Sequence, residues 1–171
     1  MRIGNIPQNF LPESRMAIAS RNDPPMTIPT LPSSLWIEPW RDSITEEKGH
    51  DPRSRYVEQF WLGVIGPTAV WLMRHIAHEF ENSPDGFELP VTATARQLGI
   101  SPKAGPRGGL QRTLHRLVMF RLASEGHAGY AIRRRLPPLN HAQLRRLPEH
   151  LQRSHAGCHP LPEPAVSANG A

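Results

Sequence analysis

The chain has 171 residues, 20 lysines and arginines against 15 acidic residues, and a mean hydropathy of -0.47. This length allows one domain with short flanking segments, and nineteen prolines with thirteen glycines are too many for a uniformly folded chain. A single cysteine excludes an internal disulfide, and the chain opens without the apolar run of a signal peptide, so we expect a cytoplasmic protein.

Residues 1–52 hold eight of the prolines and show no periodic apolar pattern, which predicts a proline-rich, disordered arm. Within it, "LPSSLWIEPW" (Leu31 to Trp40) contains two tryptophans that could anchor a protein partner. Alternatively, this segment packs back onto its own domain, against the face that carries Trp71. The two readings are left open.

Residues 53–153 are the stretch able to bury a core, and residues 154–171, with three further prolines, are expected to form a disordered tail. The uncharged run from Phe60 to Met73 is too short to span a membrane and is broken at Gly66-Pro67, which predicts a corner between two helices. Helical spacing assigns their buried faces to Tyr56, Val57, Phe60, Trp61 and Val64, and to Ala69, Leu72, Met73, Ile76 and Phe80.

Histidines offer little support for a metal site. His75 and His78 lie three residues apart on the opposite face of the second helix, but no third or fourth ligand follows, so a solvated polar face explains them. His155, Cys158 and His159 lack the paired cysteines of a structural zinc site. We assign no metal and no cofactor.

A strand and a short helix follow the helix pair. After the turn "NSPDG", the alternation in "FELPV" (Phe87 to Val91) predicts a strand, and Thr92 or Thr94 could cap the next helix. In "TARQLGIS", Gly99 supplies the left-handed residue that ends a helix, so that Ile100 can tuck beneath it.

The segment "LQRTLHRLVMFRLA" (Leu110 to Ala123) predicts an amphipathic helix over residues 110–122. Its buried face is expected to carry Leu110, Leu114, Leu117 and Val118, and its other face Arg112, His115, Arg116 and Met119. Two arginines four residues apart on one exposed face repel each other, and an anionic partner would remove that repulsion.

A hairpin is expected over residues 124–136. In strand geometry Arg133 and Arg135 share the outward face, whereas Arg134 pairs with a carboxylate or is lifted out by strand twist. Next, "NHAQLRRLPEHLQ" (Asn140 to Gln152) predicts a helix capped by Asn140 and kinked at Pro148, with an apolar strip of leucines.

Charge is divided unevenly along the chain. Residues 1–95 carry 8 basic and 12 acidic side chains, whereas residues 96–153 carry 12 basic and 2 acidic ones. This asymmetry is expected when one face of a protein meets a polyanion. The codon bias of a GC-rich genome also produces arginine-rich sequences, and this alternative stays open.

With "ARQLGIS" as the first motif helix and turn, "LQRTLHRLVMFRLA" as recognition helix and Ser124 to Leu136 as wing, residues 53–139 resemble a winged helix-turn-helix domain. The chain also resembles short uncharacterised proteins of high-GC bacteria. Two departures stand out: the loop "PKAGPRGG" between the helices is long, and Arg121 stands where the family tends to have glycine.

The resemblance implies a mainly α fold with a small β-hairpin, in which Leu98, Ile100, Leu114, Leu117 and Ile132 share one core. It further implies non-catalytic binding of double-stranded DNA in transcriptional regulation. We expect base contacts from Gln111, Arg112, His115 and Arg116, and phosphate contacts from Lys103, Arg107, Arg133 and Arg135.

No nucleotide loop, catalytic carboxylate pair or nucleophile with a base is visible, so we expect no enzyme. The alternative function is a protein-protein interaction module on the same scaffold, with Leu31–Trp40 as docking arm. A homodimer through Trp71 or the Asn140–Gln152 strip would present two half-sites about one DNA turn apart.

Overall fold

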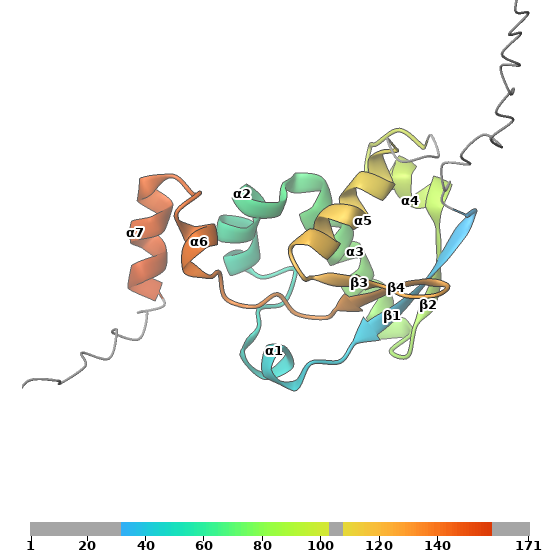
Figure 1. The fold of residues 1–171 in the computed structure, drawn as a ribbon, viewed down its shortest axis with the longest axis horizontal. Helices are drawn as coiled ribbons and strands as arrows, with labels where there is room; N and C mark the ends of the chain where they lie inside the picture. Colours follow the sequence, from blue (N-terminus) through green and yellow to red (C-terminus); the bar gives the residue numbers. More distant parts are fainter. Residues whose placement is uncertain (1–31, 103–107, 159–171) are drawn as a thin grey trace, which may run out of the picture.

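The computed structural model describes residues 32–102 and 108–158, which form a mixed α/β domain. Four strands make one sheet in the order β2-β1-β4-β3, and helices cover it and extend from it to one side (Figure 1). The strands are β1 (Ser34–Trp40), β2 (Phe87–Pro90), β3 (Ala123–Glu125) and β4 (Gly129–Arg133). The expected fold, mainly helical with one small hairpin, therefore underestimated the sheet.

The helices are short apart from two that pack together in the core. They are α1 (Ser43–Lys48), the π-helical turn η1 (Val57–Trp61), α2 (Leu62–Ile65), α3 (Pro67–Asn82), α4 (Val91–Gln97), α5 (Gly109–Met119), α6 (His141–Leu144) and α7 (Glu149–Cys158). From α3 onward, the order helix, strand, helix, helix, hairpin is the one that the sequence predicted.

Strand β1 lies at the centre of the sheet. The prediction that residues 1–52 form an arm outside the domain is therefore wrong for residues 32–52, the part of it that the structure describes. Strand β1 pairs antiparallel with β2, parallel with β4, and buries alternate residues, Leu35 and Ile37. For Leu31–Trp40 the reading of a segment that packs onto its own domain is the one observed from Ser34 onward. The segment packs as a strand of the sheet, however, and not on Trp71, which is 60% exposed.

The approach of β1 to β4 requires a glycine. A Cβ atom placed on Gly129 would lie 1.8 Å from the carbonyl oxygen of Trp36, closer than any two such atoms can come. Backbone on both sides leaves no room to relax, so this position excludes every side chain.

The corner between the first helices forms as predicted. Gly66 adopts a left-handed φ of 83°, and Pro67 takes the first position of α3, where its missing N–H costs nothing. The expected face of α3 is fully buried, and Trp61 of η1 is buried as well, its indole N–H donating to the carbonyl of Pro137 at 3.0 Å. Tyr56 and Val64 are only partly buried against this core.

The predicted core beneath the helix pair α4 and α5 is confirmed. Leu114, Leu117 and Ile132 are completely buried, and Leu98 and Ile100 are half-buried against the same cluster. One apolar core therefore joins the sheet to the helices.

The C-terminal helices pack on η1 and α2, on the side of the domain away from the sheet (Figure 1). Asn140 caps α6 as predicted, and Pro148 lies between α6 and α7. Leu144 and Leu147 are buried in the domain's own core, so the strip considered for a dimer interface is already covered. Helix α7 continues past residue 153, and its buried His155 is hydrogen-bonded to the Tyr56 hydroxyl at 2.8 Å.

Candidate nucleic-acid interface

The turn after α4 has the geometry predicted from its glycine. Gly99 has a φ of 66°, its N–H donates to Arg96 at 3.0 Å, and the Ile100 N–H donates to Ala95 at 2.9 Å, which is a Schellman ending. The Ile100 side chain then lies against Gly109 at the start of α5. The expected caps are wrong: Pro90 precedes the helix, and Thr94 is buried within it.

Helix α5 has one buried and one exposed face, as its spacing predicted. Leu110, Thr113, Leu114 and Leu117 are buried, and Val118, placed on that face, is half-buried. Arg112, His115, Arg116 and Met119 are exposed. Two guanidinium groups and an imidazole on adjacent turns can donate hydrogen bonds to phosphate oxygens or to the acceptors of guanine.

Arg116 has a structural role in addition to any contact with a ligand. Its Nη1 donates to the carbonyl of Ile65 at 3.2 Å, where α2 ends at Gly66. Arg112 and Arg116 both line a hollow of about 240 Å³ between α5 and the first turn of α3. Arg116 is therefore held in position over this hollow.

Gln111 is less available than its neighbours. Its side chain is only partly exposed, and its Oε1 is buried without a hydrogen-bond partner in the described chain. The remaining predicted residues, Lys103 and Arg107, lie outside the described residues.

Arg121 occupies the left-handed region, with a φ of 56°. Its N–H donates to Val118 and that of Leu122 to Leu117, both at 2.9 Å, so α5 ends in the same Schellman geometry as α4. Arg121 therefore forms a strained bend at the position where the winged-helix family tends to have glycine. The reversal leads directly into the hairpin of β3 and β4.

Arg133, which was expected to contact phosphate, is engaged within the domain. Its guanidinium bonds Asp42, the Thr45 hydroxyl at 2.8 Å and the Arg121 carbonyl at 2.8 Å, and it stacks on Trp40, 4.2 Å from the ring centroid. Only 13% of the side chain is exposed. The hydrogen bond from Arg133 also lowers the pKa of Asp42. Arg133 therefore joins β4 to the segment between β1 and α1.

Arg135 lies apart from α5. Its Nη1 donates to the Gly49 carbonyl at 3.1 Å, and it lines a hollow of about 300 Å³ together with Arg53, Arg134 and three carboxylates, Glu46, Asp51 and Glu81. We refer to this as the Arg135 hollow. Three arginines and three carboxylates line it, so their formal charges cancel and the hollow has no net attraction for the phosphate contact that strand alternation predicted.

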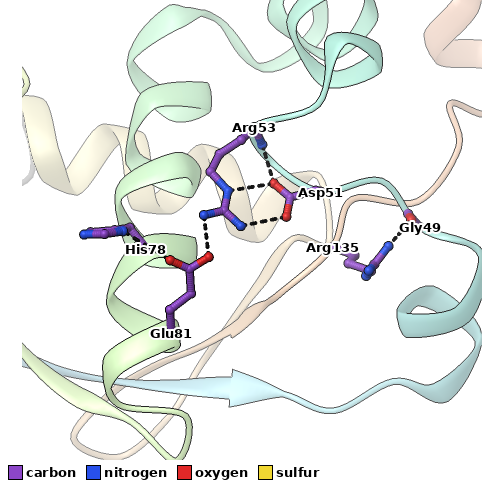
Figure 2. A network of polar contacts seen from close by, with 6 residues as sticks. All are labelled: Gly49, Asp51, Arg53, His78, Glu81 and Arg135. Atoms are coloured by element: carbon purple, nitrogen blue, oxygen red, sulfur yellow. Dashed lines mark hydrogen bonds and ion pairs between the residues drawn. The ribbon is translucent and has the colours of Figure 1, made fainter.

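An ion-pair network lies beside Arg135 (Figure 2). Arg53 bonds both oxygens of Asp51 at 3.0 Å and reaches Glu81 of α3 at 2.5 Å, while His78 lies 3.3 Å from Glu81. These hydrogen bonds lower the pKa of both carboxyl groups. The network fixes the segment before η1 to the end of α3. His78 takes part in it through Glu81, on the face of α3 that the sequence analysis assigned as polar.

Within residues 32–102 and 108–158, no group of three or more metal-ligating side chains comes together. His155 is buried against η1, and His159 lies outside the described residues. No helix in the described part of the chain is long and apolar enough to cross a membrane.

Comparison of the chain with protein-family models, curated proteins and solved structures finds no match. Function must therefore be inferred from the geometry of the site itself.

Proposed function

We propose that the protein binds double-stranded DNA through the exposed face of α5, without catalysis, and acts in transcriptional regulation. The observation that carries this proposal is the exposed set of Arg112, His115 and Arg116 on a helix whose opposite face is buried. A helix of this kind fits the major groove, where an arginine can bond the O6 and N7 of guanine.

The arrangement of elements also favours a winged-helix reading. Helices α3, α4 and α5 are followed by the β3–β4 hairpin, as in that family, and α4 ends in a tight turn beside the start of α5. The sheet adds a feature of its own, because β1 separates β2 from β4. The tip of the β3–β4 hairpin, Gly126 to Ala128, carries His127 and no arginine.

Charge supports the same face. The stretch 96–153 holds 12 basic and 2 acidic residues, and α5 itself carries no acidic side chain. With Arg133 and Arg135 engaged elsewhere, we expect about three phosphate contacts, which gives a slope of log K against log[salt] of about -3.

The test is binding to labelled duplex DNA, measured by fluorescence anisotropy as a function of salt. We expect Arg112→Ala to cost roughly 1 to 3 kcal/mol, mainly on the preferred sequence. Arg134→Ala is the matched control: it removes the same charge from an exposed residue of the Arg135 hollow and should leave binding nearly unchanged. Equal losses in both variants, or binding no tighter than that of an unrelated protein of equal charge, would refute the proposal.

The rival function, a protein interaction module with Leu31–Trp40 as docking arm, loses its main support. Leu35 and Ile37 of this segment are buried in the sheet, and Trp40 is stacked under Arg133. The part of this segment from Ser34 to Trp40 is used in the sheet, so an interaction module would need another exposed surface of the domain.

A further inference from the structure

A third hollow lies on the opposite face of α3 from the core. It has a volume of about 440 Å³, within the range of small-ligand sites, and it is open at the surface. Four of its residues lie on α3 and two at the end of α4: Trp71, Arg74, His75, His78, Gln97 and Leu98. We call it the Trp71 hollow.

Trp71 is the feature of this hollow that most needs explanation. Its side chain is 60% exposed, although Trp61, on the preceding turn η1, is completely buried. The guanidinium of Arg74 lies 5.1 Å from the indole centroid, within the range of a cation–π contact. An indole held by a neighbouring cation and open to solvent offers a flat surface for another ring.

The Trp71 hollow carries side chains that can donate hydrogen bonds to an anion. No carboxylate is among its lining residues. Arg53, at its edge, is paired with Asp51 and Glu81, and His78 lies 3.3 Å from Glu81 (Figure 2). Arg74 is only loosely paired with Glu58, at 3.7 Å, and the His75 side chain forms no hydrogen bond or ion pair within the described chain. Two nitrogen groups beside the indole are thus available.

Self-association through this surface is disfavoured by the same charges. A two-fold contact between Trp71 side chains would bring Arg74 of each copy toward Arg74 of the other. Like charges juxtaposed in an interface cost free energy. A ligand that combines a flat ring with negative charge would instead stack on the exposed indole of Trp71 and pair with the guanidinium of Arg74.

We propose that the Trp71 hollow binds an unpaired nucleotide, with the base stacked on Trp71 and the phosphate held by Arg74 and His75. The nucleotide can belong to single-stranded DNA or be free in solution, since both present the same chemistry. This site is separate from the α5 face, and it does not depend on duplex binding. Base–aromatic stacking contributes about 1 to 3 kcal/mol, which corresponds to roughly 5- to 150-fold in affinity.

The experiment uses the full chain and a short labelled oligothymidylate, with thymidine monophosphate and thymidine as competitors. We expect Trp71→Ala to weaken oligothymidylate binding by roughly 5- to 150-fold and Trp71→Phe to restore most of it. His75→Gln should weaken binding of the monophosphate and leave thymidine unaffected. If thymidine monophosphate displaces the labelled oligothymidylate, a free nucleotide is sufficient for binding. If only unlabelled oligothymidylate displaces it, the ligand is the single strand.

Ile44→Ala is the matched control, because Ile44 is an apolar side chain, 70% exposed, on α1 and outside the hollow. It should leave affinity unchanged, and circular dichroism verifies that each variant is folded. The proposal is overturned if folded Trp71→Ala binds oligothymidylate within twofold of the parent or loses duplex binding to the same degree. Sedimentation showing that Trp71→Ala abolishes a dimer would also overturn it.

Discussion

The position of β1 in the sheet leads to a direct test by substitution of Ile37. This side chain is completely buried between β2 and β4, so Ile37→Ala removes three carbon atoms from the core. At about 0.8 kcal/mol for each, transfer alone accounts for about 2.4 kcal/mol, and the cavity left behind adds to it. We expect the free energy of unfolding to fall by about 3 to 4 kcal/mol.

The measurement is urea unfolding followed by tryptophan fluorescence, with Glu38→Ala as the control. Glu38 is the next residue of β1, but it faces solvent, so its replacement should change stability by no more than about 0.5 kcal/mol. If Ile37→Ala fails to fold, Ile37→Val should cost about 0.5 to 1.5 kcal/mol. Equal effects at Ile37 and Glu38, or a loss below about 1 kcal/mol for Ile37→Ala, would show that β1 is not part of the core.

Two further predictions concern stability. Arg121→Gly should raise the free energy of unfolding by about 0.5 to 1 kcal/mol. Glycine relieves the left-handed strain, and the greater backbone entropy of the unfolded glycine chain offsets part of that gain. A lower midpoint temperature of thermal unfolding would contradict this. Burial raises the pKa of the Tyr56 hydroxyl above its usual value of 10.0. The contribution of the protonated hydroxyl to the free energy of unfolding is therefore complete below about pH 10, and it is lost as the pH rises through the folded-state pKa. Tyr56→Phe should therefore flatten the alkaline decrease in unfolding free energy, and an unchanged pH profile would refute this.

The elements that the sequence predicted well depend on local chemistry. Gly66-Pro67 sets a helix corner and Gly99 ends a helix through bonds to residues a few positions away, so their geometry is contained in short windows. The buried face of α5 follows from its own spacing. Local patterns of this kind need no knowledge of the rest of the fold.

Long-range pairing explains what the sequence could not provide. Prolines at both ends of β1 suggested disorder, but the strand is stabilised by β4, which follows much later in the chain. The role of Arg133 was missed for the same reason: its partners Asp42 and Thr45 lie in the segment assigned to an arm. Strand alternation gave the direction of Arg135, but not the carboxylates that surround it.

The parallel pairing of β1 with β4 also has a consequence for synthesis of the protein. Trp36 lies opposite Gly129, 93 positions later, so β1 leaves the ribosome long before its partner exists. At about 5 to 20 residues per second, β1 waits roughly 5 to 20 s for β4. The sheet therefore closes only after most of the domain has been translated, and the alternating apolar residues of β1 stay available to other chains or chaperones until then.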